Sequence, residues 1–128
     1  MTETKKTILV VEDEAPAVLA LGDVLKGEGF EVLTAGNGKE GLASAIAKRP
    51  DMILADLKMP EMGGLDMVRQ LRADEWGKSV PVMILTNAAD GETVQAAQDL
   101  GALEYFIKGD MHMAEIIERI RARLGEKA

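Results

Sequence analysis

The chain has 128 residues, enough for one domain with a self-sufficient core and too few for two ordinary domains. We therefore expect a single domain over residues 1–128, without a separate output domain. The formal net charge of -7 argues against non-specific nucleic-acid binding, which needs basic surface to neutralise phosphates. No cysteine is present, which excludes a disulfide framework, a thiolate nucleophile and a cysteine-based zinc site.

The balance of residue types is that of a globular protein, with 47% hydrophobic and 29% charged residues. The first apolar run, from Ile8 to Val11, is far too short for a signal peptide or a membrane span. We expect a soluble cytoplasmic protein that has no membrane partner.

Short apolar runs recur along the chain and predict strands that are covered on both faces. They lie at residues 7–11, 31–35, 51–55, 81–86 and 104–108. Glycines fall at most of the joints, as turns between elements require.

The segments between these runs have the apolar spacing of helices. The fourth, at about residues 91–100, is only weakly amphipathic, and the last begins behind a predicted N-cap, Asp110. The residues predicted to face the core are Val18, Leu21, Gly22, Leu25, Leu42, Ala45, Ile46, Leu65, Val68, Leu71, Met113, Ile116, Ile117, Ile120 and Leu124.

Strand and helix alternate five times, which predicts a doubly wound α/β domain with a parallel sheet. In such a sheet the functional crevice lies beyond the carboxyl ends of the strands. The polar residues at these ends are Glu12, Asp13, Asp56, Thr86, Asn87 and Lys108.

Three of these residues, Glu12, Asp13 and Asp56, are carboxylates that repel one another unless a cation is present, and Mg²⁺ suits their oxygen ligands. The alternative is that Glu12 and Asp13 only place negative charge at the N-terminus of the helix opened by Pro16.

Asp56 can also act as a nucleophile, because a carboxylate beside Mg²⁺ can attack an activated phosphoryl group. Lys108 and the Thr86 hydroxyl would then contact phosphoryl oxygens. Taken singly, Lys108 can instead extend to solvent from the sheet end and Thr86 can cap the next helix.

The motifs "ILVVEDE", "ILADLKMPEMGG", "VMILTNA" and "GALEYFIKGD" resemble the receiver domain of two-component response regulators over essentially the whole chain. The resemblance implies a flavodoxin-like five-stranded sheet of order 2-1-3-4-5. It also implies that Asp56 is the phosphoacceptor and that Lys108 contacts the phosphoryl group.

The same resemblance implies that Glu12, Asp13, Asp56 and the main-chain carbonyl of Lys58 bind Mg²⁺. Thr86 would be the switch hydroxyl. Tyr105 would be the switch aromatic, and an ordinary half-buried edge-strand aromatic is the alternative.

Three positions bear on how closely the chain follows this family. Gly109 replaces the usual proline after Lys108, which leaves open whether that peptide bond is cis. Asn87 stands where a small residue is usual, and its side chain is expected to narrow access or add a polar contact. The Lys58 side chain is expected to influence how fast the phosphoryl group is lost.

The leading hypothesis is a stand-alone receiver, a switch rather than a turnover enzyme. It would take a phosphoryl group from a histidine kinase or phosphotransfer protein and act on a downstream protein, as a monomer or a phosphorylation-dependent dimer. A phosphorylation-independent pseudo-receiver is an alternative. An aspartyl-phosphate hydrolase needs an aspartate where Lys58 stands, and a nucleotide-binding module needs a phosphate loop where the acidic "VEDEAP" stands.

Overall fold

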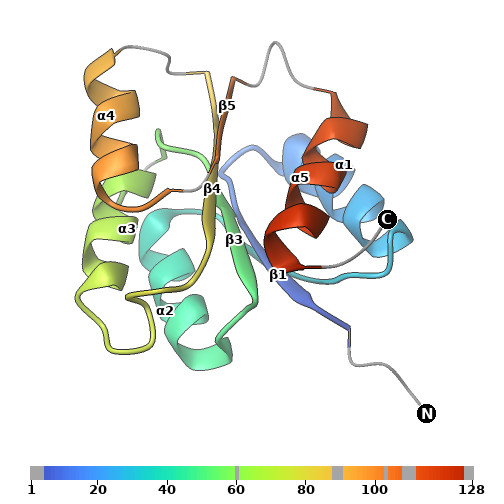
Figure 1. Ribbon diagram of the computed structural model, residues 1–128, viewed down its shortest axis with the longest axis horizontal. Coiled ribbons are helices and arrows are strands. Elements are labelled where there is room, and N and C mark those ends of the chain that lie inside the picture. The colour runs from blue at the N-terminus through green and yellow to red at the C-terminus, as the bar shows by residue number, and fades with distance from the viewer. Residues whose placement is uncertain (1–4, 60, 88–90, 103, 108–111, 126–128) are drawn as a thin grey trace.

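The computed structural model describes residues 5–59, 61–87, 91–102, 104–107 and 112–125, and its centre is one parallel β-sheet (Figure 1). The strand order β2-β1-β3-β4-β5 confirms the expected topology. The strands are β1 Thr7–Val11, β2 Glu31–Ala35, β3 Met52–Ala55, β4 Val82–Thr86 and β5 Glu104–Ile107.

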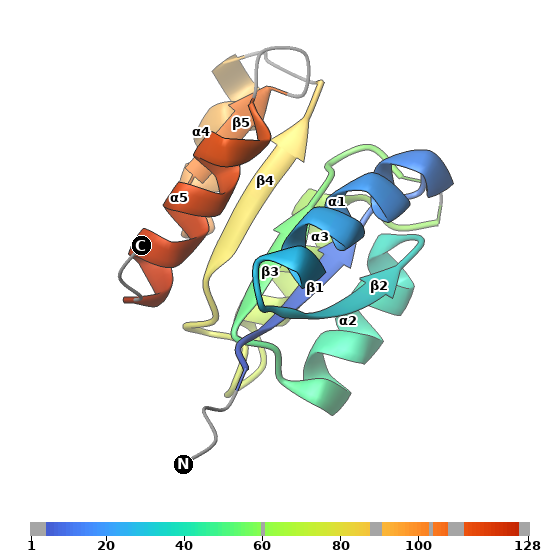
Figure 2. The same ribbon diagram turned by 90° about the vertical axis from the view of Figure 1, so that its right-hand side faces the viewer.

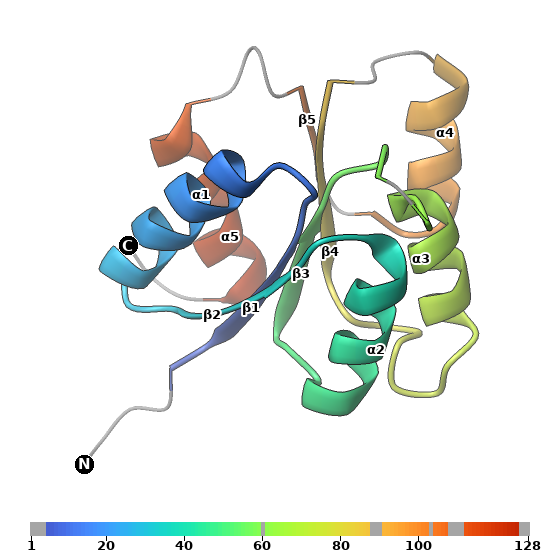
Figure 3. The ribbon, with the colours of Figure 1, turned by 180° about the vertical axis from the view of Figure 1, so that it is seen from behind.

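Helices cover both faces of the sheet, with α1 and α5 on one face and α2, α3 and α4 on the other (Figures 1 and 3). Among the described residues, no helix is long and apolar enough to cross a membrane. The helices are α1 Ala15–Gly27, α2 Gly38–Lys48, α3 Gly64–Arg72, α4 Gly91–Asp99 and α5 Met113–Leu124.

The core has two layers because each strand sends alternate side chains to opposite faces. In β1, Ile8 and Val10 pack with α1 and α5, whereas Leu9 and Val11 pack with α2 and α3. This arrangement explains why the strand sequences are continuously apolar instead of alternating with polar residues. The sheet can be followed between its helical layers in Figure 2.

Most predicted core residues are buried or partly buried, but the prediction for Ile46 is wrong, since it is 41% exposed. Helix α2 instead buries Gly38, Gly41 and Ala45. A Cβ atom on Gly41 would lie 2.9 Å from a Val11 methyl group, so the helix sits close to the sheet on its small residues. Ile46 follows Ala45 by one position and is rotated about 100° away from that face.

The helix ends agree in part with the sequence. Pro16 lies in the first turn of α1, as predicted, and Glu14 is its N-cap residue. His112 occupies the N-cap position of α5, and the predicted cap, Asp110, lies outside the described residues. Helix α4 buries only Ala97, in agreement with its weak amphipathicity.

The loop between β3 and α3 is held by close backbone contacts. The Gly64 amide donates to the Leu57 carbonyl at 3.0 Å, and the Gly38 amide donates to the Met62 carbonyl at 2.8 Å. A Cβ atom on Gly64 would overlap the main-chain carbonyl oxygen of Asp56. The backbone that carries Asp56 therefore depends on glycine at position 64.

Gly64→Ala is expected to destabilise the domain by about 1–3 kcal/mol, because the new methyl group forces the Asp56 backbone to move. Gly27→Ala is the matched control. Gly27 is helical, and a Cβ atom added to it would meet no other atom within 4 Å, so alanine should stabilise by about 0.5 kcal/mol. Urea unfolding measures the free energy of unfolding of both variants, which should fall for Gly64→Ala and rise for Gly27→Ala. Equal changes in the two variants would contradict the close contact at Gly64.

Candidate phosphoryl and metal site

The carboxyl ends of β1 and β3 bring Glu12 and Asp56 side by side. These strands pair in register, with Val11 opposite Ala55. The Asp56 amide donates to the Val11 carbonyl at 3.0 Å, which continues the pairing one residue beyond the strands. Glu12 and Asp56 are each only 7% exposed. Two carboxylates therefore lie close together where solvent screening is reduced.

Asp13 and Glu14 complete an acidic cluster at this edge of the sheet. One carboxylate oxygen from each of Glu12, Asp13, Glu14 and Asp56 lies within 4.8 Å of the other three. The structure thus brings together the three predicted carboxylates and adds Glu14, which the sequence reasoning did not select. Glu14 is visible in the run "EDE". It lies three positions after the strand end, where the sequence alone indicates the start of the next helix and not the site.

The chemistry of this donor set suits a hard cation. Like charges at such spacing repel, and oxygen ligands bind Mg²⁺ in preference to softer metals. Glu12 also accepts a hydrogen bond from the Glu14 amide at 3.2 Å, just before α1. The two interpretations of Glu12, as a metal ligand and as an acid at the helix N-terminus, are therefore compatible.

The Asp56 carboxylate is oriented by the backbone that follows it. Its Oδ1 accepts hydrogen bonds from the Leu57 amide at 2.7 Å and the Lys58 amide at 3.4 Å. These donors hold the side chain in one orientation. The Lys58 side chain itself is exposed.

An open cleft of about 320 Å³ gathers most of the predicted site residues. Thr86, the last residue of β4, is buried to 1% exposure, and Asn87 beside it is exposed. The cleft is lined by Asp13, Glu14, Asp56, Lys58, Thr86 and Asn87.

Among the described residues, Tyr105 does not line this cleft. Tyr105 lies on β5, half-buried, and packs against the core layer under α2, α3 and α4. Lys108 and its bond to Gly109 lie outside the described residues, so the position of Lys108 remains a prediction.

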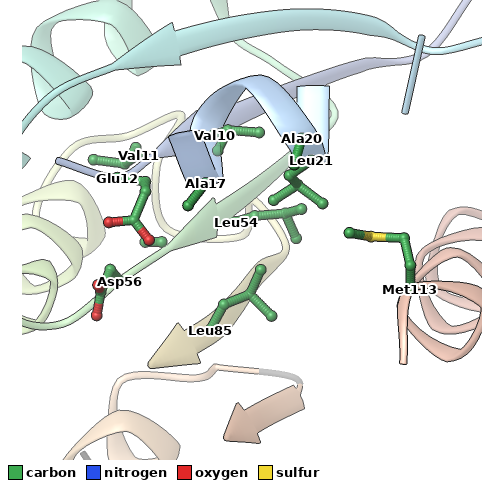
Figure 4. A pocket seen from close by; sticks show the side chains of 11 residues that line it. Val10, Val11, Glu12, Ala17, Ala20, Leu21, Leu54, Asp56, Leu85 and Met113 are labelled. Carbon is green, nitrogen blue, oxygen red and sulfur yellow. The ribbon is translucent and has the colours of Figure 1, made fainter. Parts of the chain in front are cut away.

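A second cavity of about 170 Å³ lies behind the acidic cluster, on the side of the sheet covered by α1 and α5 (Figure 4). Its walls are apolar side chains, with Leu21, Leu54, Leu85 and Met113 pointing into it. Glu12 and Asp56 stand at one end. Apolar surroundings strengthen the attraction of these carboxylates for a cation, because little water competes.

In a parallel α/β sheet, ligands bind beyond the carboxyl ends of the strands, which is where this chain places an oriented aspartate inside an acidic cluster. The family model for the response regulator receiver domain matches residues 8–121. The chain therefore belongs to the receiver domain family of two-component response regulators, whose members are signalling switches.

The curated relatives that match are longer than this chain. The DNA-binding response regulator MtrA of Mycobacterium tuberculosis is 39% identical over 97% of the chain and 53% of MtrA. The transcriptional regulatory protein PrrA of the same species is 36% identical over 94% of the chain and 51% of PrrA. The chain spans about half the length of these relatives.

Solved structures of receivers match nearly the whole chain. The chemotaxis protein CheY4 of Vibrio cholerae superposes with a TM-score of 0.86 and 28% identity, covering 93% of this chain and 98% of CheY4. The receiver domain of the sensor histidine kinase PA1611 of Pseudomonas aeruginosa has a TM-score of 0.86 and 28% identity, covering 96% of this chain and 100% of that one. That receiver holds a magnesium ion in its active-site cleft.

Mg²⁺ at about ten times its dissociation constant is expected to stabilise the domain by about 1.4 kcal/mol. Asp13→Asn should raise the stability of the metal-free protein, because it removes one repelling charge, and should reduce the gain from Mg²⁺ by at least about half. Asp23→Asn, on the exposed surface of α1, makes the same charge change away from the cluster. Thermal unfolding in Mg²⁺ and in EDTA measures these gains, and equal gains in all three proteins would contradict a site at Asp13.

Proposed function

We propose that this receiver accepts a phosphoryl group on Asp56 in a Mg²⁺-dependent reaction. The observation that carries the proposal is the Asp56 carboxylate, held by two backbone amides inside a cluster of carboxylates within 4.8 Å of one another. An aspartate that only stabilises the fold gains nothing from neighbouring carboxylates. A phosphoacceptor uses them, because they bind the metal ion that its reaction requires.

In the proposed reaction, an Asp56 oxygen attacks the phosphorus atom of a phosphohistidine, or of a small-molecule phosphodonor, and an O–P bond forms. The bond from phosphorus to the donor nitrogen or oxygen breaks, and its electron pair leaves with the donor. Bound Mg²⁺ supplies positive charge that offsets the charge of the transferring oxygens. Glu12, Asp13, Asp56 and the main-chain carbonyl of Lys58 would hold it.

The remaining contacts come from other strand ends. The Thr86 hydroxyl is a neutral donor for one phosphoryl oxygen, and Thr86 lines the same cleft as Asp56. Lys108 would supply a cation for another phosphoryl oxygen. Asn87 lines the cleft from its exposed side and would narrow the approach of a phosphodonor or of water.

The switch is proposed to run from the cleft to the surface formed by α4, β5 and α5. Phosphorylated Asp56 carries more negative charge and new acceptor oxygens, and Thr86 would move toward it. The β4 and β5 strands pair with Thr86 opposite Ile107 and Ile84 opposite Tyr105. A shift at Thr86 would therefore reach the half-buried Tyr105 through the neighbouring strand.

The proposed partners are a histidine kinase or phosphotransfer protein as the phosphodonor, and a downstream protein that reads the α4, β5 and α5 surface. The formal charge of -7 does not suit direct nucleic-acid binding by this domain. A cytoplasmic receiver that is a monomer or a phosphorylation-dependent dimer is part of the same proposal.

Two alternatives are weaker on specific residues. A phosphorylation-independent pseudo-receiver has no need of the acidic cluster around an oriented Asp56. An aspartyl-phosphate hydrolase would need a second aspartate two residues after the nucleophile, where this chain has Lys58. The protein is therefore proposed to be a switch that assists its own phosphorylation rather than a turnover enzyme.

Incubation with acetyl phosphate and Mg²⁺ should add one phosphoryl group to the protein, as measured by intact mass. EDTA should abolish the gain, because the carboxylate cluster then lacks the cation that offsets its charge. Asp56→Asn should abolish it as well, whereas Asp66→Asn, on the exposed surface of α3, should not.

A gain that persists in Asp56→Asn would place the acceptor elsewhere. No gain in any of these proteins, under conditions that phosphorylate a control receiver, would favour the pseudo-receiver.

A further inference from the structure

Arg72, the last residue of α3, binds the backbone of two separate joints in the fold. Its Nε donates to the Leu100 carbonyl at 2.8 Å, and its Nη2 donates to the Gly101 carbonyl at 3.4 Å. Its Nη1 donates to the carbonyls of Gly77 at 2.9 Å and Val80 at 2.7 Å. One guanidinium thus ties the joint between α4 and β5 to the joint between α3 and β4.

The chemistry of this contact is specific to arginine. The Arg72 side chain is partly buried, and this burial lowers the pKa of its guanidinium. Carbonyl dipoles at the end of α4 carry partial negative charge and offset that cost. A planar fork of donors can reach several carbonyls at once, whereas a lysine ammonium cannot copy this geometry.

The C-terminal end of α4 is also fixed by its own backbone. Gly101 has a φ of 83°, the left-handed conformation that ends many helices. The Gly101 amide donates to the Gln98 carbonyl at 2.9 Å, and the Ala102 amide donates to the Ala97 carbonyl at 3.0 Å. Leu100 packs on the same core layer as Ala97, so this end is held by apolar and polar contacts together.

The N-terminal half of α4, residues 91–95, contains no buried residue. Gly91 and Glu92 are exposed, and Ala97 is the only buried residue of the helix. This N-terminal end is the one that follows β4, and therefore Thr86 and the cleft, along the chain. Ala97 and the Arg72 contacts thus lie toward the end of α4 that is farther from the site along the chain.

We propose that Arg72 is a positioning residue that makes the C-terminal end of α4 a pivot, so that phosphorylation tilts this helix instead of loosening it as a whole. The tilt rests on the proposed phosphorylation of Asp56. The anchoring of α4 by Arg72 does not depend on it. Arg72 lies in neither the cleft nor the acidic cluster, so it acts on the switch and not on the chemistry.

The anchoring is tested without any phosphorylation, by amide hydrogen exchange of the unmodified protein. Arg72→Met should raise the exchange rates of the Leu100, Gly101 and Ala102 amides by at least about tenfold, while the amides of β1 and β3 keep theirs. Arg69→Met is the control, since Arg69 lies on the same helix and binds only the exposed Asp66, at 2.6 Å, among the contacts described. Arg72→Lys should give a smaller increase and serves if the methionine variant does not fold.

The tilt is tested at Tyr105, the only tyrosine in the chain, which can be replaced by 3-fluorotyrosine to give one ¹⁹F resonance. Phosphorylation should shift this resonance in the wild type and in Arg69→Met. In Arg72→Met the shift should fall to less than about half, although intact mass shows the same phosphorylated fraction. A merely structural Arg72 would lower the melting temperature and leave the shift unchanged.

The outcomes separate the two proposals. Unchanged exchange at Leu100, Gly101 and Ala102 in Arg72→Met overturns the anchoring, and an unchanged ¹⁹F shift in the phosphorylated variant overturns the pivot. A wild-type protein that gains no phosphoryl group refutes the proposed function instead. In that case the hydrogen-exchange result still decides whether Arg72 fixes this end of α4.

Discussion

The repulsion among carboxylates at the ends of β1 and β3 is the constraint on which the site depends. Parallel pairing in register places Glu12 and Asp56 on neighbouring strands, both nearly buried, and the start of α1 adds Asp13 and Glu14. An arrangement of this kind is costly without a cation, and it lies at the sheet edge where this fold class binds ligands. The cost is understandable if Mg²⁺ and a phosphoryl group are what the edge is built to hold.

The rest of the fold keeps these groups in place with small residues and backbone contacts. Gly64 lets the loop after β3 approach the Asp56 carbonyl, and Gly41 lets α2 lie close to Val11. The Leu57 and Lys58 amides then orient the Asp56 carboxylate. Close backbone contacts thus position the acidic edge, whereas α4 buries only Ala97. This contrast suits a domain in which a fixed chemical site changes a surface that has more than one arrangement.

Much of this structure could be predicted from sequence, because strand and helix periodicity are local properties. The five strands, the five helices and the meeting of Glu12, Asp13 and Asp56 all follow from apolar spacing and from the parallel sheet. The prediction for Ile46 is wrong because this residue has the spacing of a core residue, whereas α2 packs on the sheet through the face that carries Gly41.

Arg72 could not be predicted, because its acceptors are main-chain carbonyls of residues 77, 80, 100 and 101. Every residue has a main-chain carbonyl, so the sequence does not mark these acceptors. Only the folded chain brings them to one guanidinium. Glu14 was visible in the sequence, but its membership of the cluster depends on how the turn into α1 folds back toward Asp56.

The most direct test of the central claim is a crystal structure of the chain grown with Mg²⁺ and beryllofluoride, which mimics a phosphoryl group. We predict a beryllofluoride bonded to an Asp56 oxygen, with Mg²⁺ held beside it by Glu12, Asp13, Asp56 and the Lys58 carbonyl. An adduct on another residue, or Mg²⁺ bound away from the acidic cluster, would contradict the account.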